Sequence, residues 1–381
     1  MAARVILSLL FLPVALAEKW AVIAAGSQGF MNYRHQADAC HAYQIMLKSG
    51  VPAANIILMM QDDVAKSSEN PFPGQLFNKP GNASLDVYKG CKVDYSGDIV
   101  TAQLFLDVLT GKGKGKEACE SGSMLPDLKD DGKILAVTAS NGKESSWGTY
   151  CGDEAVVKGK NIGSCLGDLF SVNWMEDDDL GKLASETFRS QISKVTKLTN
   201  KSHVCSFGDK SFEDEAIGRV EGALISDVFS DSSKGAVDAR DIYVTQAYWA
   251  WQNAAVDQKE KAWARFVGIV NDRERDDQLF ATMGRQACGS TKVQLDECQQ
   301  SILGDRAEMK DMDCHKKLAT LVHEHCPVSS SHHATGGWNG YNMKFSQVLL
   351  NLCEHQEELG QSVDQLAQIV EEECSKAICS K

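Results

Sequence analysis

The sequence predicts an α/β protein with a parallel sheet, followed by an all-helical C-terminal part. Short apolar runs at residues 20–25 and 56–60 flank a helical pattern that stops at Gly50. A strand, a helix and a strand within about 45 residues form a βαβ unit, which implies parallel strands covered by helices. Residues 134–139 are a third apolar run, and helical periodicity dominates from residue 256 onward.

The individual elements follow from their patterns. The run at residues 20–25 ends at Gly26, and the run at 56–60 is apolar throughout, so both are expected to be buried strands. Between them, one helical face carries four apolar residues at helical spacing: Ala37, Cys40, Tyr43 and Leu47. The run at 134–139 leads into the polar loop NGKESSWGTYCGD.

Polar clusters follow each predicted strand. They are residues 32–35 (NYRH), residues 62–63 (DD) and residues 144–146 (ESS). In open parallel sheets the functional site lies at the carboxyl ends of the strands. We therefore expect these three clusters to lie near one another.

The N-terminus and the charge restrict the class of protein. Residues 1–17, MAARVILSLLFLPVALA, combine the basic Arg4 with an apolar run and small residues, which is typical of a secretory signal peptide. No later stretch is long and apolar enough to span a membrane. A net charge of −13 argues against nucleic-acid binding. In the secretory pathway the 13 cysteines can form disulfides, and Asn82 and Asn200 begin glycosylation sequons.

Several long motifs are spread over most of residues 19–205. They are NYRHQADACHAY, MMQDDVA, NPFPGQLFNKP, EACESGSM, ESSWGTYCGD and LGDLFSVNWMEDDD. Together they resemble the legumain family of asparaginyl endopeptidases, also called vacuolar processing enzymes. In the C-terminal part, VLLNLCEH and the order of four cysteines are similar too. The resemblance implies a caspase-like α/β/α sandwich followed by an all-helical, disulfide-bonded prodomain.

The resemblance also implies roles for individual residues. Cys119 is the nucleophile, and Asn32 orients the catalytic histidine of the family. The S1 pocket, which takes the asparagine side chain of the substrate, is formed by Arg34, Glu117, Ser146 and Asp168, with His35 and Ser145 beside them. A pocket for a neutral amide needs both donors and acceptors, and an arginine, carboxylates and hydroxyls supply them.

The sequence departs from the family pattern near residues 111–116. In legumains a strand with the catalytic histidine in a Thr-Asp-His-Gly loop lies between a segment like FLDVLTG and the EACESGS motif. Here little more than a Gly-Lys repeat joins these segments, and no apolar strand precedes Cys119. Two strands and their crossovers correspond to roughly 50 residues of the family pattern. We therefore expect a sandwich that lacks internal strands.

Cleavage needs a base that takes the proton of the Cys119 thiol. The catalytic region retains only His35, His41 and His203. His35 belongs to the pocket motif, His41 lies within a predicted helix, and His203 stands beside a sequon in a predicted surface turn. We expect none of them to replace the missing histidine, so the chain as written is predicted to be inactive.

Two other motifs have alternative interpretations. GKGKGK partly matches a phosphate-binding loop, but Glu117 stands where that loop needs a hydroxyl, so a flexible linker is expected. Cysteine and histidine cluster at residues 314–315, 323–326 and 332–333, but the spacing fits no tight zinc site and oxidised cysteines do not bind zinc. We expect neither a metal nor a cofactor.

The resemblance assigns residues 256–381 to a prodomain that covers the active site as an intramolecular inhibitor. It implies the disulfides Cys314–Cys353 and Cys326–Cys374; Cys288 and Cys298 could pair locally, and Cys379 is left over.

Release of the prodomain follows acidification and cuts after asparagine, and Asn253 and Asn271 lie in the right region. At neutral pH, Arg34 and lysines around the cleft are expected to pair with prodomain carboxylates. Such pairs weaken as the carboxylates become protonated.

We predict the precursor of a legumain-like cysteine endopeptidase that cleaves proteins after asparagine in a lysosome-like or vacuolar compartment, or after secretion. Its domains are a signal peptide (1–17), a peptidase domain (18–205), a linker or end of the catalytic region (206–255) and the prodomain (256–381). Two explanations of the missing segment stay open. Either an exon is skipped and the complete protein is active, or the chain is a non-catalytic homologue that binds peptides or proteins.

Overall fold

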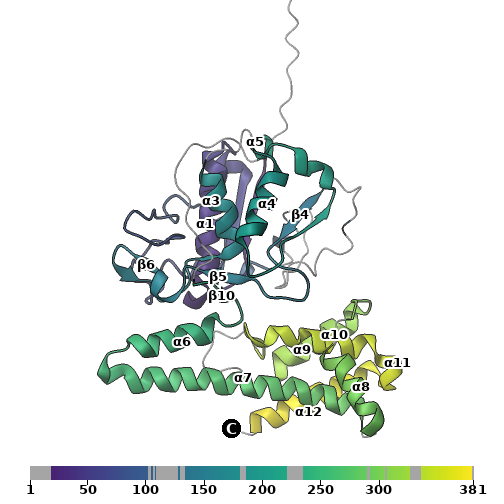
Figure 1. The fold of residues 1–381 in the computed structure, drawn as a ribbon. Coiled ribbons are helices and arrows are strands. Elements are labelled where there is room, and N and C mark those ends of the chain that lie inside the picture. The colour runs from purple at the N-terminus through teal and green to yellow at the C-terminus, as the bar shows by residue number, and fades with distance from the viewer. Residues whose placement is uncertain are drawn as a thin grey trace, which may run out of the picture.

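The computed structural model describes residues 19–101, 134–180, 186–220, 235–289, 292–304, 307–326 and 336–379, together with residues 104, 105, 108 and 128. Figure 1 shows two parts: an α/β part formed by the first half of the chain, and a helical part that begins with α6 and lies against one end of it. The expected signal peptide, Glu117 and Cys119 lie outside the described residues.

The described strands are short and form four separate sheets, ordered β1-β2-β3, β10-β5-β8, β4-β9 and β6-β7. Their bounds are β1 Ala21–Ala25, β2 Ile56–Met60, β3 Tyr95–Ser96, β4 Leu135–Thr138, β5 Trp147–Thr149, β6 Val156–Val157, β7 Lys160–Asn161, β8 Gly167–Asp168, β9 Cys205–Gly208 and β10 Val237–Asp238.

The predicted βαβ unit is present. Strands β1 and β2 pair in parallel from Ala21 opposite Ile56 to Ala25 opposite Met60, and α1, Tyr33–Lys48, connects them. The helix ends just before Gly50, which has a φ of +88°, a conformation that glycine adopts without strain. Because most of β2 is buried, its apolar residues on both faces have packing partners, as expected for a strand inside an α/β layer.

The third predicted strand, β4, pairs antiparallel with β9, from Leu135 opposite Gly208 to Thr138 opposite Cys205. In the described part of the chain it does not pair with β1 or β2. Among the described residues, β4 and the βαβ unit therefore belong to separate sheets.

A small antiparallel sheet gathers three distant segments. Strand β5 pairs with β8 through Gly148 and Asp168 and with β10 through Trp147 and Asp238. This sheet brings the loop before β5 to the N-terminus of α1. Helices α3 (Leu169–Asp179), α4 (Phe188–Leu198) and α5 (Ile217–Val220) complete the α/β part.

The helical part consists of α6 Ile242–Asn253, α7 Lys259–Cys288, α8 Lys292–Leu303, α9 Met312–His325, α10 Ser346–Glu354, α11 Gln356–Leu359 and α12 Val363–Cys379. Its core packs apolar side chains of α7, α9, α10 and α12 around Phe280 and Leu318. The structure contains the pairings Cys314–Cys353 and Cys326–Cys374 and the local pair Cys288–Cys298. No helix among the described residues has the length and apolar composition that a membrane span requires.

We expected residues 206–255 to be a linker or the end of the catalytic region, and the described residues of this range include regular structure. Strand β10 belongs to the sheet of β5, and Ile242 at the start of α6 packs against Cys151 and Cys165. Helix α6 also contacts α7. This segment therefore attaches the helical part to the α/β part.

Two further disulfides lie in the α/β part, Cys40–Cys91 and Cys151–Cys165. The first joins α1 to the segment before β3 across 51 residues of sequence. A cross-link that closes a loop of this length restricts the unfolded chain strongly.

The change Cys91→Ser should lower the free energy of unfolding of the α/β part by about 2 to 4 kcal/mol, the usual effect of losing a disulfide that closes a long loop. Urea unfolding followed by intrinsic fluorescence measures this. Cys205→Ser is the matched control, because Cys205 is a half-buried free thiol. An equal effect of the two changes would contradict a stabilising role for the Cys40–Cys91 bond.

Candidate functional site

The N-terminus of α1 lies at the carboxyl end of β1. Gly29, with a φ of +83°, starts a tight turn at residues 30–32 that leads directly into the helix. The backbone N–H of Gly29 donates to Asp63 Oδ2 at 2.7 Å, and the Gln36 amide donates to Asp63 Oδ1 at 2.6 Å. The polar residues that follow β1 and β2 therefore lie together.

The centre of the site is an ion pair between Arg34 and Asp168. Arg34 Nε donates to Asp168 Oδ1 at 2.9 Å, and the two side chains are 5% and 18% exposed. Burial alone would raise the pKa of Asp168, but the charge of Arg34 and the neighbouring His35 outweigh it and hold this pKa below its usual range. The carboxylate therefore stays ionised in moderately acidic solution.

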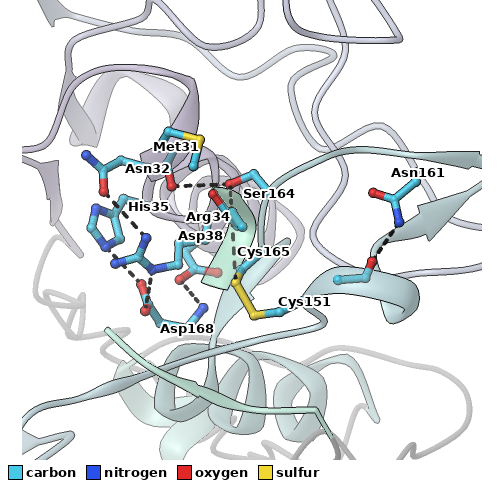
Figure 2. The surroundings of a disulfide bond; sticks show 12 residues. Met31, Asn32, Arg34, His35, Asp38, Cys151, Asn161, Ser164, Cys165 and Asp168 are labelled. Carbon is cyan, nitrogen blue, oxygen red and sulfur yellow. Dashed lines mark hydrogen bonds and ion pairs between the residues drawn. A yellow bond between two sulfur atoms is a disulfide. The ribbon is translucent and has the colours of Figure 1, made fainter. Parts of the chain in front are cut away.

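His35 completes this cluster as a neutral group. Its Nε2 lies 3.3 Å from Asp168 Oδ2, and its Nδ1 contacts Ser27 Oγ. Burial, and secondly the charge of Arg34, lower the pKa of His35 to about 4, against the opposing effect of Asp168. Figure 2 shows Arg34, His35 and Asp38 converging on Asp168.

The loop before β5 places Ser145 and Ser146 beside these residues. Both serines line the same cavity as Arg34 and His35. The carbonyl of Ser146 accepts from the Ala239 N–H at 2.9 Å, so the end of the loop is held by the segment after β10.

Glu144 fixes the middle of this loop. Its Oε1 accepts from the backbone N–H of Asn141 at 3.1 Å and of His203 at 2.6 Å, and its Oε2 lies 2.8 Å from His203 Nδ1. Burial raises the pKa of Glu144, but the hydrogen bonds from His203 and Asn141 lower it more, and the net pKa is below its usual range.

Asn32 lies between the two parts of the chain. Its Nδ2 donates to the Gln28 carbonyl at 2.9 Å and to the hydroxyl of Tyr243 in α6 at 3.1 Å. Its Oδ1 accepts from Arg34 Nη1 at 3.5 Å. An amide in this position, with a donor and an acceptor on the same side chain, can orient a further polar group.

A cavity of about 670 Å³ lies between the two parts of the chain. The α/β part contributes Asn32, Arg34, His35, Ser145 and Ser146, and the helical part contributes residues that include His315, Trp338, Met343, Lys344 and Gln347. The described half of the predicted S1 pocket thus opens into a space that the helical part covers. Glu117 and Cys119, the other predicted members of the site, lie outside the described residues.

Our expectation that Arg34 pairs with carboxylates of the helical part is wrong. Arg34 is buried at the base of the pocket, and its ion pair is with Asp168. In the charged contact that joins the two parts, the cation lies in the helical part and the carboxylate lies just before it. Arg273 of α7 donates to Asp241, just before α6, at 2.8 Å and also contacts the carbonyl of Arg240.

The remaining predicted residues are distributed over the surface. Asn82, Asn200, Asn253 and Asn271 are all exposed. Cys314 and Cys326, at the centre of the alternative zinc interpretation, form disulfides. No group of three metal-ligating side chains occurs among the residues that the structure describes.

Comparison with known proteins shows the family. A sequence model of the "Peptidase C13 family" matches residues 19–117 and 115–223. The chain is 33% identical over 436 positions to the vacuolar-processing enzyme delta-isozyme of Arabidopsis thaliana, covering 94% of this chain and 90% of the relative. It is 32% identical to legumain of Rattus norvegicus, with 88% of each chain covered. Legumain of Mus musculus is 39% identical over 53% of this chain and 59% of the relative.

The fold, the site and these comparisons define a cysteine endopeptidase of the caspase-like class. The chain belongs to the peptidase C13 family, the family of the legumains and vacuolar-processing enzymes. The two family matches meet at residues 115–117, next to the expected deletion. The Arabidopsis alignment spans 436 positions, which is 55 more than the 381 residues of this chain. That relative therefore has at least this many residues without a counterpart here.

Sequence reasoning missed several residues of this site. Asp38 accepts from the Asp168 backbone N–H at 2.9 Å, and its position four residues after Arg34 on one helix face is the signal that could have indicated it. Tyr243 could not be predicted, because its contact with Asn32 spans 211 residues.

Replacing Glu144 by Gln should loosen the loop that carries Ser145 and Ser146, because the neutral amide lacks the charged acceptor that faces His203. We expect faster deuterium uptake by mass spectrometry in residues 139–147 and 199–208. A carboxylate with a lowered pKa stabilises the folded state fully above its unfolded value of about 4.3 and loses this effect as the pH falls through the folded value. The difference should therefore be fully present above about pH 5 and shrink at lower pH.

The matched control is Glu215→Gln, because Glu215 pairs with Arg219 on the surface, away from this loop. Equal uptake in wild type and Glu144→Gln at residues 139–147 would contradict the role of Glu144.

Proposed function

We propose that this chain is the precursor of a legumain-type endopeptidase that selects asparagine at P1 and is held inactive by its helical C-terminal part. The observation that carries the proposal is the Arg34–Asp168 pair with neutral His35, next to the hydroxyls of Ser145 and Ser146. The named relatives support a vacuolar or lysosomal compartment, and the predicted signal peptide also allows secretion.

The chemistry of this cluster suits a carboxamide. Arg34 supplies N–H donors for a side-chain carbonyl, and Asp168 and the serine hydroxyls supply acceptors for an NH₂ group. The formal charges of Arg34 and Asp168 cancel, which favours a neutral side chain over a carboxylate. An apolar side chain would leave these buried polar groups without partners, which strongly disfavours its binding.

The histidines of the α/β part have other partners. His35 contacts Asp168 and Ser27, and His41 lies 2.7 Å from Asn78 Oδ1 and 3.0 Å from Asp179 Oδ2. His203 faces Glu144 and is 81% exposed. These contacts support the absence of a replacement for the family's catalytic histidine.

The chain as written should not cleave a fluorogenic Ala-Ala-Asn substrate at a useful rate, because loss of the general base lowers rates by several orders of magnitude. The measurement is fluorescence release after acid treatment, beside a Cys119→Ser control. Turnover that scales with protein concentration and disappears in Cys119→Ser would overturn the proposed inactivity.

Sequencing of cDNA across codons 105–120 separates the two explanations of the missing segment. A transcript with about 50 more codons, enough for two strands and their crossovers, favours an active enzyme. If only the present form occurs, the second candidate is favoured: a non-catalytic homologue that uses the same pocket to bind asparagine-containing peptides. This candidate is supported by the cluster of Arg34 and Asp168 in the proposed S1 pocket, in a sequence that lacks the catalytic histidine loop of the family.

The position of the helical part supports the proposal that the chain is an inactive precursor. This part covers the cavity in front of Arg34 and is fixed to the α/β part by the contacts of Arg273 with the Arg240–Asp241 turn. Acidification is expected to favour release of the helical part, as the resemblance to legumains implies.

The two candidate processing sites differ in backbone conformation. Asn253 is the last residue of α6, and Ala254 and Ala255 after it are extended. Asn271 lies inside the 30-residue helix α7. Peptidases commonly bind their substrates as extended strands, so a cut after Asn253 needs only the last turn of α6 to unwind, whereas a cut after Asn271 needs the interior of α7 to unwind.

Incubation with an added active legumain at about pH 4, where carboxylates become protonated, should release a fragment that ends at Asn253. Mass spectrometry identifies the new terminus. The change Asn253→Gln should abolish this fragment, whereas Asn271→Gln should leave it. An intact chain after prolonged treatment, or a first cut after Asn271, would contradict this order.

A further inference from the structure

One face of α1 carries a row of buried polar side chains. Arg34, Asp38 and His41 occupy positions i, i+4 and i+7, which share a helix face. Arg34 and Asp38 are buried, and the side chain of His41 is 12% exposed. Buried polar groups are costly unless they are hydrogen-bonded, so this row must have partners.

At the outer end of the row, a chain of hydrogen bonds leads from the surface to Asp38. Asp179 Oδ2 lies 3.0 Å from His41 Nε2, and His41 Nδ1 lies 2.7 Å from Asn78 Oδ1. The Asn78 amide then donates to Asp38 Oδ1 at 2.6 Å and to the Leu166 carbonyl at 2.8 Å. The position of Asp38 is thus fixed from the side opposite the pocket.

The inner end of the row reaches the pocket itself. Asp38 Oδ2 accepts the backbone N–H of Asp168 at 2.9 Å. Figure 2 shows Asp38 beside the backbone nitrogen of Asp168, while the His35 ring lies beside its carboxylate. Asp168 is therefore held by Asp38 at its main chain and by Arg34 at its carboxylate.

The backbone at this point cannot move closer or carry a side chain. A Cβ atom at Gly167 would lie 2.9 Å from Asp38 Oδ1, 2.8 Å from Asn78 Nδ2 and 2.4 Å from a methyl group of Val172. Glycine here lets the chain before Asp168 pack directly on the Asp38–Asn78 pair.

The charges of the cluster require a shared proton. Two carboxyl groups, Asp38 and Asp168, face one guanidinium, Arg34, while His35 is neutral above about pH 4. Two adjacent buried carboxyls do not both ionise readily. Asp168 is the ionised partner, since it bonds Arg34 directly. Burial, and secondly the charge of Asp168, raise the pKa of Asp38 well above its usual range.

We propose that Asp38 is a positioning residue of the S1 pocket. It accepts the backbone N–H of Asp168 and so fixes this residue against Arg34, which sets the preference for an amide over a carboxylate side chain. With Asp168 in place, the charge of Arg34 is matched within the protein. With Asp168 displaced, Arg34 is free to bind a substrate carboxylate. This inference rests on the asparaginyl pocket proposed above.

The test uses the full-length chain after the acid treatment that is expected to release its helical part, and it measures equilibrium binding, so it does not depend on turnover. Fluorescein-labelled acetyl-Ala-Ala-Asn, acetyl-Ala-Ala-Asp and acetyl-Ala-Ala-Ala amides are titrated at about pH 5.5, where an exposed aspartate is ionised. Wild type should bind the Asn peptide more tightly than the Asp and Ala peptides. Asp38→Ala should reduce the Asn-to-Asp preference about tenfold, the effect of losing one buried hydrogen bond.

The outcomes separate the two proposals. A wild type without preference for the Asn peptide would overturn the asparaginyl pocket and this inference with it. A wild-type preference that Asp38→Ala keeps would overturn the role of Asp38 alone, and so would equal weakening of the Asn and Asp peptides. Asp214→Ala, at a surface residue paired with Arg189, is the control, and Asp38→Ser replaces Asp38→Ala if that variant does not fold.

Discussion

The buried ion pair between Arg34 and Asp168 is the constraint on which the site depends. It joins the first turn of α1 to strand β8 and so couples the parallel βαβ unit to the sheet of β5, β8 and β10. Removing one member of a buried pair typically costs about 3 to 5 kcal/mol, because the other charge is left without a partner. The hydrogen bonds of Asp38 and the contact of His35 complete the neighbourhood of Asp168. The arrangement of a pocket and the stability of the fold thus rest on the same residues.

The position of this pair in the sequence explains how a chain can retain a substrate-binding pocket while it lacks the residues for catalysis. The described specificity residues come from residues 32–35, 145–146 and 168, on either side of residues 111–119. The nucleophile and the expected deletion fall inside that segment. Because Arg34 and Asp168 meet through α1 and β8, their contact does not require the internal strands. In the inactive chain that we propose, substrate selection is therefore separated from catalysis.

Local pattern predicted the βαβ unit well, because period and length identify β1, α1 and β2 from residues near one another. The site was assigned through the family motifs, and the structure brings together Asn32, Arg34, His35, Ser145, Ser146 and Asp168. Long-range pairings escaped prediction. The partner of β4, the bond between Cys40 and Cys91, and the contact of Asn32 with Tyr243 depend on the tertiary fold. The expected pairing of Arg34 with the helical part failed because charge alone does not reveal that a side chain is buried.

The central claim, a built asparaginyl pocket beside a cysteine without a base, is tested most directly by the alkylation of Cys119. The rate of its reaction with iodoacetamide is followed by peptide mass spectrometry from about pH 5 to 9, a range that includes the ordinary thiol value of about 8.5. Free Cys205 in the same sample is an internal reference. Without a base, Cys119 should react slowly in acid and gain rate only as the pH approaches that of an ordinary thiol. Rapid alkylation of Cys119 at about pH 5, with Cys205 unreactive, would show an activated thiolate and contradict the account.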